Sequence, residues 1–185
     1  FMLILPDGTA EELRQTFDDI IGELPEITLD NGARLRVRIL GGAVTFDMAE
    51  DSADSLVNKL TQSLECARER GDGRYCLYSR QIQESFERRV LIKKELKESS
   101  RNDFRGFELY YQPMVSNDGK QIRGCECLLR WTCNSVTDST PMEFIPILEE
   151  SGEIVEVGRF IMREAMKRQK EWSEKFGSFF VSFNV

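Results

Sequence analysis

Histidine is absent from the 185-residue sequence, and several other features are scarce. The absence of histidine excludes His-based catalytic triads and histidine ligands for a metal ion. The five cysteines are odd in number and scattered, without the spacing of a secreted disulfide framework, so they indicate a reducing cytoplasm. No apolar run approaches the roughly 20 residues that a membrane helix needs. The opening "FMLILPDG" lacks the basic start of a signal peptide and reaches a turn almost at once.

Positive charge is also limited, because the 25 Lys and Arg residues are outnumbered by 32 Asp and Glu residues and the net charge is −7. A protein that binds long nucleic acid needs a concentrated basic surface, and the sequence contains none. A small anionic ligand is compatible with this balance if a metal ion or a few arginines offset the charge locally. The composition is 41% hydrophobic and 31% charged, which is typical of a soluble globular protein with one ordinary domain or two small ones.

Residues 1–80 alternate between strand and helix patterns. The segment "FMLILP" predicts a short strand, and Thr9 and Glu12 form a capping box ahead of an amphipathic helix. The segment "ARLRVRILGGAVTFD" alternates like a strand as far as Gly41–Gly42, where we expect a bulge or a close backbone approach. A second amphipathic helix ends at Gly71, before the short strand "RYCLY". These patterns predict an α+β unit.

Residues 81–103 are highly charged, and their apolar residues recur at helical spacing. We interpret this segment as a helical connector between two units. A solvated helix with no role beyond spacing is the simplest interpretation of such a charge run. The apolar positions that define the helical spacing are Ile82, Phe86, Val90 and Leu91.

Residues 104–185 combine a hairpin pattern with two helices and a final strand. The apolar runs "GFELYYQPMV" and "QIRGCECLLRW" flank "SNDGK", and an Asn-Asp-Gly turn between two such runs is a strong hairpin signal. A short helix is expected after Pro141 and ends near Gly152, and "VEVGRFIMREAMKRQKEWSEKFG" predicts a long amphipathic helix. The strand "SFFVSFNV" follows. A strand, a long helix and another strand indicate a βα unit and a parallel sheet.

The stretch "CECLLRW" places a carboxylate inside an apolar strand. Because successive strand residues face opposite sides, the glutamate lies on one face and the cysteines on the other. The cysteines then behave as small hydrophobic residues beneath a helix. A structural zinc site would need further Cys or His ligands at the right spacing, and Cys133 alone does not supply them. The first face carries Glu126, Leu128 and Arg130, and the second carries Cys125, Cys127, Leu129 and Trp131.

Glu126 and Arg130 share a face but lie about 13 Å apart along the strand, so they cannot neutralise each other. The two other expected strands repeat this pattern. In "LYYQP" one face carries Tyr110 and Gln112, and in "FVSFNV" one face carries Ser182 and Asn184. Each of the three strands therefore has one face with polar residues. Polar groups at the C-terminal ends of parallel barrel strands commonly form an active site. A carboxylate and an amide oxygen there would suit Mg²⁺ or Mn²⁺. A half-buried antiparallel sheet with a wet face produces the same pattern.

At these residues the chain resembles the bacterial GGDEF–EAL proteins of cyclic-di-GMP signalling. The segment "FELYYQPMVSNDGKQIRGCECLLRW" is similar to the opening of an EAL domain, with "ECL" where the family usually has "EAL". The segments "FIPILEESGEIVEVGRFIMREAMKRQKEW" and "VSFNV" follow in the family's order. The resemblance covers about Phe104 to Val185. It implies a TIM-like barrel that hydrolyses cyclic-di-GMP to pGpG with Mg²⁺ or Mn²⁺.

The resemblance also implies roles for individual residues. Glu126 and Asn184 would be metal ligands. Gln112, Leu128 and Arg130 would contact the dinucleotide, and the guanidinium of Arg130 suits a phosphate or a guanine edge. A homodimer through the EAL domain is a further expectation. Cys127, which replaces the family's usual alanine, faces away from the site, so we expect little functional cost.

Residues 1–80 resemble, more weakly, the C-terminal half of a GGDEF domain. Phe1 would be the last letter of that signature, and "RVRILGGAVTF" and "LTQSLECARERGDGRYCLY" would be a later strand and the last helix and strand. The family's acidic residue and lysine are replaced here by Thr61 and Arg68, so the unit is expected to be degenerate. The loop that binds GTP phosphates would precede Phe1, and we expect no diguanylate cyclase activity.

The expected fold is therefore α/β: a partial α+β GGDEF-like unit (residues 1–80), a helical connector (81–103) and the first strands and helices of an EAL barrel (104–185). A complete (β/α)₈ barrel takes about 250 residues. The family's later acidic ligands and its lysine would lie beyond Val185, so no catalytic residue is assigned. The leading hypothesis is a parent phosphodiesterase specific for cyclic-di-GMP. The alternatives are an inactive EAL-type receptor for the dinucleotide and an interaction module.

Overall fold

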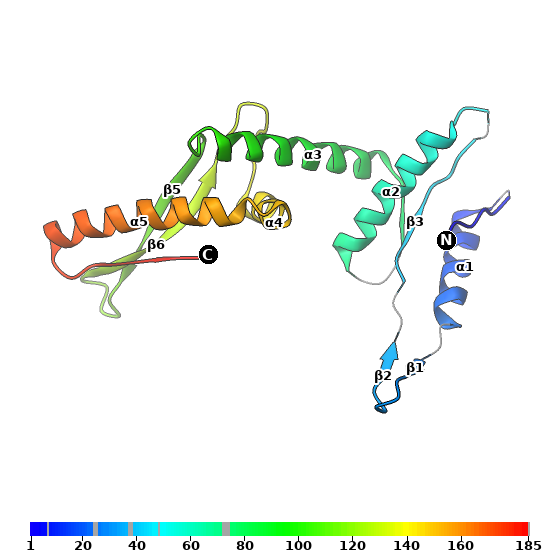
Figure 1. Ribbon diagram of the computed structural model, residues 1–185, viewed down its shortest axis with the longest axis horizontal. Coiled ribbons are helices and arrows are strands. Elements are labelled where there is room, and N and C mark those ends of the chain that lie inside the picture. Colours follow the sequence, from blue (N-terminus) through cyan, green and yellow to red (C-terminus); the bar gives the residue numbers. More distant parts are fainter. Residues whose placement is uncertain (7, 24–25, 37–38, 48, 72–74, 185) are drawn as a thin grey trace. The chain divides into compact units, whose positions relative to one another are not determined.

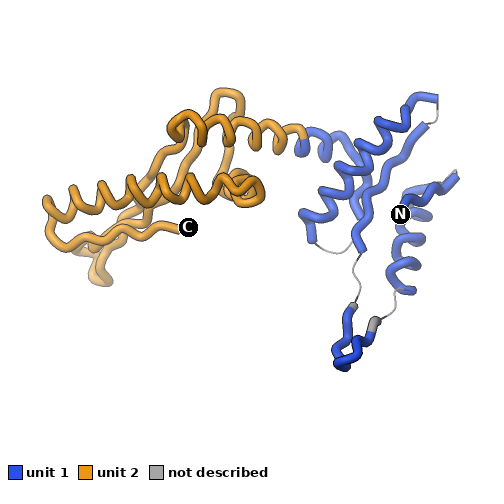
Figure 2. Tube along the Cα trace, in the orientation of Figure 1, with its two compact units in different colours: residues 1–86 blue, residues 87–185 orange. Residues whose placement is uncertain are grey.

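The computed structural model describes residues 1–6, 8–23, 26–36, 39–47, 49–71 and 75–184. The chain divides into two compact units, Phe1–Phe86 and Glu87–Val185, called unit 1 and unit 2 below (Figure 2). The division falls inside helix α3 (Arg80–Arg101), which therefore contributes to both. None of the helices in the described ranges has the length and apolar character needed to cross a membrane.

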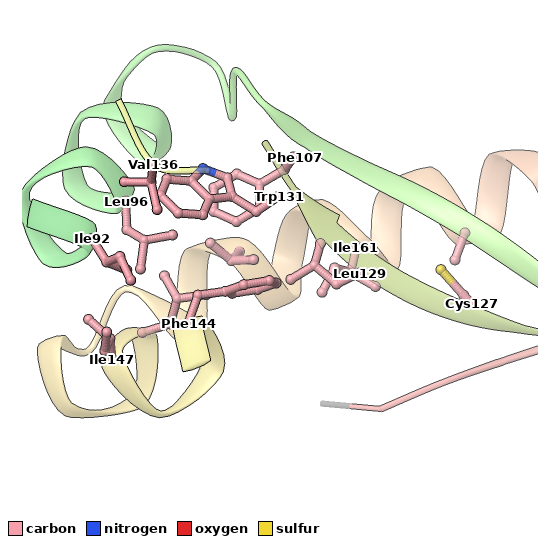
Figure 3. Packing of buried hydrophobic residues seen from close by; sticks show 13 residues of the cluster. Ile92, Leu96, Phe107, Cys127, Leu129, Trp131, Val136, Phe144, Ile147 and Ile161 are labelled. Carbon is pink, nitrogen blue, oxygen red and sulfur yellow. The ribbon is translucent and has the colours of Figure 1, made fainter. Parts of the chain in front are cut away.

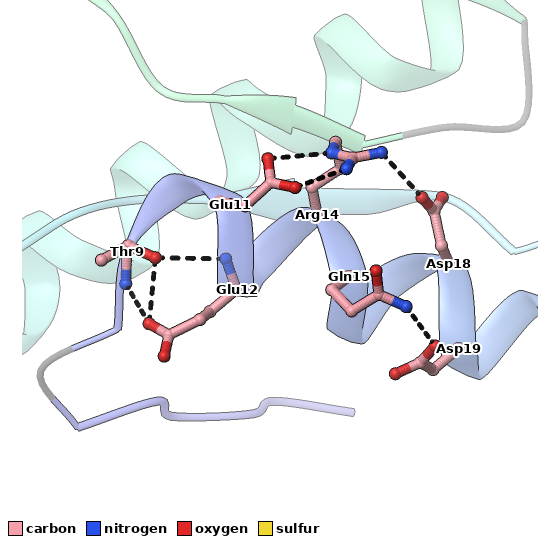
Figure 4. Close-up of polar contacts among 7 residues, drawn as sticks. All are labelled: Thr9, Glu11, Glu12, Arg14, Gln15, Asp18 and Asp19. Atoms are coloured by element: carbon pink, nitrogen blue, oxygen red, sulfur yellow. Dashed lines mark hydrogen bonds and ion pairs between the residues drawn. The ribbon is translucent and has the colours of Figure 1, made fainter.

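Unit 1 begins with helix α1 (Ala10–Gly22), which starts at the predicted capping box. The backbone N–H of Glu12 donates to Oγ1 of Thr9, and the Thr9 backbone N–H donates to Oε2 of Glu12 at 2.7 Å (Figure 4). This exchange satisfies donors that the first helical turn leaves without partners. Arg14 bridges Glu11 and Asp18 along the same exposed surface. No residue of α1 is fully buried.

Between α1 and α3, the described residues of unit 1 form two two-stranded sheets and an 18-residue helix (Figure 1). Strands β1 (Glu26–Thr28) and β2 (Arg34–Arg36) form an antiparallel pair. Strands β3 (Gly41–Ala43) and β4 (Tyr75–Leu77) pair in parallel, and helix α2 (Ala53–Arg70) connects them and packs against both. The α+β pattern expected of this region is present.

Two glycines of unit 1 have the roles that their positions suggested. Gly71 ends α2 in the left-handed conformation with φ 65°, which glycine adopts without steric cost. Gly42 allows the close approach, because a Cβ there would lie 2.5 Å from the carbonyl oxygen of Leu60 and 2.6 Å from the backbone nitrogen of Leu64. The backbone of α2 therefore rests directly on β3.

One predicted strand is absent, and another is shorter than its pattern suggested. Residues Phe1–Leu5 form no strand, and Met2, Leu3 and Ile4 are exposed. A strand requires a partner for its backbone groups, and none of the described segments pairs with this one. The alternating run after Ala33 divides into β2 and β3; the alternating residue Val37 lies outside the described residues.

The charged segment predicted as a connector is indeed helical, but it is more than a solvated spacer. Ile92 and Leu96 of α3 are 0% and 1% exposed and belong to the core of unit 2, whereas Val90 is 54% exposed. The buried face contains residues further along the helix, because unit 2 covers only its second half.

Unit 2 is built on a three-stranded sheet with the order β5-β6-β7. Strands β5 (Phe107–Val115) and β6 (Ile122–Trp131) are antiparallel, and the predicted hairpin turn joins them. Helices α4 (Pro141–Ser151) and α5 (Ile154–Phe176) then lead to β7 (Phe180–Phe183), which pairs with β6 in parallel. The βα unit and the parallel pair are confirmed, in a mixed α/β unit.

One face of this sheet and the helices α3, α4 and α5 enclose the core (Figure 3). Phe144 of α4 is fully buried and lies 6.0 Å, between ring centroids, from Trp131 at the end of β6. The indole N–H of Trp131 donates to Oγ of Ser99 in α3 at 3.1 Å. In the middle of β5, Tyr111 meets Trp172 of α5 edge to face, with the ring centroids 4.8 Å apart. The opposite face of the sheet is therefore the one left for a site.

Candidate functional site

Strand β6 presents its polar side chains on the face that the helices leave uncovered. Along this strand, every second residue from Cys125 to Trp131 is buried, whereas Glu126, Leu128 and Arg130 are intermediate in exposure. This alternation follows from the two-residue period of a strand. It confirms that Glu126 and the cysteines lie on opposite faces.

The sheet register places partners on both sides of Glu126. Gln112 of β5 is directly opposite Glu126 in the antiparallel pair, and Ser182 of β7 is its neighbour in the parallel pair. Residues that are directly opposite one another in adjacent strands project from the same face. Gln112, Glu126 and Ser182 therefore form a row across all three strands.

Asn184, which follows β7, completes this group. Its side-chain Nδ2 donates a hydrogen bond of 3.2 Å to Oε1 of Glu126. Asn184 is exposed and Glu126 is half-buried, so the pair lies at the rim of the sheet face. The predicted metal-ligand pair is thus brought together by segments that are 58 positions apart in the chain.

Arg130 and Leu128 lie further along the same face. The guanidinium carbon of Arg130 is 5.6 Å from the ring centroid of Tyr110, and its Nη1 donates to the Leu129 carbonyl oxygen at 2.8 Å. Leu128 is opposite Tyr110 in the register, and Glu108 is opposite Arg130. The aromatic ring and the carbonyl group therefore hold Arg130 in place. It lies on the same face as Glu126, four residues further along β6, and has no contact with the Glu126–Asn184 pair in these interactions.

The residues of the site do not all lie at the C-terminal ends of their strands, where the active site of a parallel barrel is commonly found. Phe180, which begins β7, is level with Gly124, and Phe183 is level with Cys127. Asn184 therefore follows the C-terminal end of β7, whereas Glu126 lies in the middle of the longer β6. Because β7 pairs only with Gly124–Cys127 of β6, the residue that follows β7 lies beside the middle of β6 and not beside its end.

The other face of β6 is not suited to ligand chemistry. Burial raises the pKa of the Cys125 thiol and of the Cys127 thiol. Cys127 is opposite Tyr111, and burial, with a smaller contribution from Cys127, raises the pKa of that tyrosine to about 12. Because Tyr111 contacts Trp172 of α5, these cysteines belong to the packed side of the sheet, as predicted.

The Glu126–Asn184 pair has the donor chemistry for a hard divalent cation. A carboxylate oxygen and an amide oxygen are typical ligands of Mg²⁺, which also keeps several waters. Turning the Asn184 amide by half a rotation presents its oxygen where the nitrogen now lies. The described residues contain no group of three or more His, Cys, Asp or Glu residues that could hold a metal. The pair therefore fits as two ligands of a larger set.

Two features of the site could not be read from the strand pattern. The Tyr110 ring beside Arg130 requires the exact pairing of β5 with β6. The approach of Phe180 to Gly124 requires the pairing of β6 with β7, and a Cβ on Gly124 would lie 2.4 Å from the Phe180 carbonyl oxygen. The glycine before "CECLLRW" is the only sequence signal of this close contact.

The chain is similar to several bacterial signalling proteins. It is 25% identical over 174 residues to the oxygen sensor protein DosP of Escherichia coli, covering 93% of this chain and 21% of DosP. It is 25% identical over 146 residues to the cyclic di-GMP phosphodiesterase PdeR of E. coli, covering 79% of this chain and 22% of PdeR. The chain thus spans about a fifth of the length of these relatives.

A solved structure of the phosphodiesterase PaMucR in complex with c-di-GMP covers 50% of this chain and 38% of its own, at 26% identity and a TM-score of 0.45. A protein-family profile gives the more specific result: the profile of the EAL domain matches residues 93–185. Because this match covers just over half of the chain, the chain belongs to the EAL-domain family.

Proposed function

We propose that unit 2 contributes the first part of a site that hydrolyses cyclic-di-GMP to pGpG in the complete protein. Membership of the EAL family supports the proposal, as does the similarity to PdeR, a cyclic di-GMP phosphodiesterase. The observation that carries it is the contact between the Asn184 amide and the Glu126 carboxylate on the open face of the sheet. This contact joins the two positions at which the family resemblance implies metal ligands.

In this proposal Glu126 and Asn184 hold Mg²⁺ or Mn²⁺. A bound divalent cation would activate water and offset charge on the phosphodiester. The protein's own contribution is to hold the carboxylate at a fixed depth: Glu126 is half-buried in the middle strand, with Gln112 on one side and Ser182 on the other. A ligand on a central strand is positioned more exactly than one on a loop.

Gln112, Leu128 and Arg130 would contact the dinucleotide. Arg130 offers a planar guanidinium that can form two parallel hydrogen bonds to a phosphate or to a guanine edge. The Tyr110 ring, whose centroid is 5.6 Å from the guanidinium carbon, orients that group. Leu128 lies between Glu126 and Arg130 on the same face, where it would meet an apolar part of the ligand.

For unit 1 we propose a degenerate GGDEF-like unit that regulates the site and has no cyclase activity. The motif order of residues 1–80 supports this. The alignment with DosP supports it too, because it extends over 174 residues and so must include part of unit 1 as well as unit 2. The segment 81–103 would then link the two domains, and 104–185 would be the EAL part. A cytoplasmic location and a homodimer through the EAL domain stay predictions.

The test is metal-dependent hydrolysis by the full-length protein that contains this chain. Glu126→Gln keeps the side-chain shape but removes its charge, so hydrolysis should fall by orders of magnitude, while cyclic-di-GMP binding measured by calorimetry persists. Arg130→Ala should instead weaken binding, since a bidentate contact is worth roughly ten-fold or more in affinity. Glu149→Gln, which removes an exposed carboxylate from α4, is the control for charge, and Cys127→Ala should be nearly silent.

The outcomes separate the alternatives. Unchanged hydrolysis in Glu126→Gln would contradict the metal assignment. A wild-type protein that binds the dinucleotide with high affinity but never cleaves it would establish the receptor instead. A protein that binds neither the dinucleotide nor a metal would be an interaction module.

A further inference from the structure

Two thiols of unit 1 lie beside each other, far from the proposed site in the sequence. Sγ of Cys66 in α2 is 2.9 Å from Sγ of Cys76 in β4, and neither forms a disulfide. A disulfide bond has a sulfur–sulfur distance of about 2.05 Å, so a shift of about 1 Å would join the two atoms. The two sulfur atoms are therefore already close enough for a bond to form with only a small movement of the side chains.

The fold explains why these sulfurs meet. Cys76 is opposite Gly42 in the parallel pair of β3 and β4. Because Gly42 has no side chain, the backbone of α2 rests on β3 near Leu60 and Leu64, and the next turn of α2 carries Cys66 over β4. The same close approach that defines the packing of unit 1 therefore brings the two cysteines together.

The two cysteines differ in their access to solvent. Cys76 is 2% exposed, whereas Cys66 is intermediate in exposure. A dissolved oxidant can therefore reach Cys66 first, and Cys76 is in place to react with the product. This is the arrangement of an accessible thiol beside a resolving thiol.

We propose that Cys66 and Cys76 form a reversible thiol–disulfide pair that responds to hydroperoxides. The Cys66 thiolate attacks an oxygen of the hydroperoxide, the O–O bond breaks, and the alcohol or water leaves after taking up a proton, so that Cys66 becomes a sulfenic acid. Sγ of Cys76 then attacks Sγ of Cys66; the S–O bond breaks and water leaves with the thiol proton. In total, two thiols and one hydroperoxide give one disulfide, one alcohol or water, and one further water. A dithiol reductant reverses the change by thiol–disulfide exchange.

The other three cysteines provide the contrast. Cys125 and Cys127 are buried in unit 2, and burial raises the pKa of both thiols, which reduces the thiolate fraction that reacts. The thiol of Cys133 donates to Oε2 of Glu95 at 3.0 Å. Of the five cysteines, Cys66 and Cys76 are the pair whose sulfurs the structure places in contact.

The bond would tie the C-terminal part of α2 to the central residue of β4. Such a cross-link lowers the conformational entropy of the unfolded chain. The midpoint temperature of thermal unfolding of oxidised unit 1 should therefore be about 5–10 °C higher than that of reduced unit 1. The inference concerns unit 1 alone and does not depend on the proposed hydrolysis in unit 2.

The experiment uses the 185-residue chain, reduced with dithiothreitol, desalted and treated with hydrogen peroxide. Remaining thiols are alkylated and counted by intact mass, and the linked peptides are identified after trypsin cleavage. We expect the wild type to lose two of its five thiols through a Cys66–Cys76 link and to regain them with dithiothreitol. Cys66→Ser should keep its four remaining thiols under the same conditions, whereas Cys133→Ser should still lose two.

Three results would overturn the proposal: a wild type that keeps all five thiols, a link that involves a different cysteine, or loss of two thiols in Cys66→Ser. Circular dichroism of Cys66→Ser and Cys66→Ala checks that these variants fold. The side chain of Cys66 is partly exposed, so neither substitution leaves a fully enclosed cavity.

Discussion

The two units of this chain are similar in length but differ in what they bury. The fully buried apolar residues described in unit 1 are small: Ala43, Ala67 and Cys76. Unit 2 instead buries one continuous cluster that includes large side chains such as Trp131 and Phe144. Burial of apolar surface stabilises a fold roughly in proportion to area, so unit 2 has the larger driving force.

Strand length explains the difference. The strands of unit 1 have three residues each, whereas β5 and β6 have nine and ten. A long strand contributes several side chains to the same face and can support a core, but a three-residue strand contributes one or two. The candidate site lies on the unit with long strands, where a ligand can be held in a fixed position.

The largest expected effect is the loss of a core aromatic ring from unit 2. Phe144→Ala should lower the free energy of unfolding of this unit by about 3–5 kcal/mol, because the ring is fully buried. Phe46→Ala makes the same change in unit 1 at a side chain that is 41% exposed, and should cost about 1 kcal/mol or less.

Urea denaturation measures both variants. Both tryptophans, Trp131 and Trp172, belong to unit 2, so their fluorescence reports on that unit and circular dichroism reports on both. Equal shifts in the two variants would contradict the comparison between the units.

An intermediate effect is expected where unit 1 depends on a close approach of helix and strand. Gly42→Ala would place a Cβ 2.5 Å from the Leu60 carbonyl oxygen, so α2 must move away from β3, and unit 1 should lose about 1–3 kcal/mol. The control is Gly22→Ala at the end of α1, where a Cβ meets nothing within 4 Å. Hydrogen exchange of α2 amides gives the measurement, and faster exchange in Gly22→Ala than in Gly42→Ala would refute the argument.

The smallest effect concerns an ion pair between α3 and α4 in unit 2. Hydrogen bonds from Arg88, at 2.5 and 2.9 Å, lower the pKa of the Glu143 carboxyl. The stabilisation is present above the unfolded pKa of a glutamate, roughly 4.3, and is lost as the pH falls through the lower pKa of the folded state. Both side chains are about one-third exposed, so the contribution should be about 1 kcal/mol or less.

Glu143→Gln should therefore reduce the stability of unit 2 near pH 7 and flatten its decline below about pH 4.3. Urea titrations monitored by tryptophan fluorescence at several pH values measure this slope. Glu149→Gln on the same helix is the control and should keep the wild-type slope. A Glu143→Gln slope equal to that of the wild type would show that the pair does not contribute.

The sequence was sufficient for most elements of unit 2 and less so for unit 1. The turn around Asn117–Gly119 and the long amphipathic run of α5 are strong local signals, and both elements are where they were predicted. The "FMLILP" pattern failed because an apolar run is a strand only when another strand pairs with it. The helix α3 was predicted, but its burial was not, since its composition is that of a solvated helix and the covering surface comes from α4 and β6.

The sequence by itself determined that Glu126 and Cys127 lie on opposite faces of β6, because the two-residue period of a strand leaves no other arrangement. Tertiary structure decided which residues Glu126 meets. The register of β7 against β6 places Asn184 beside Glu126, and the packing of α2 on β3 and β4 places Cys66 beside Cys76. The first contact joins residues 58 positions apart and the second joins residues ten positions apart in two different elements. Both depend on how strands pair and helices pack, so neither leaves a local pattern in the sequence.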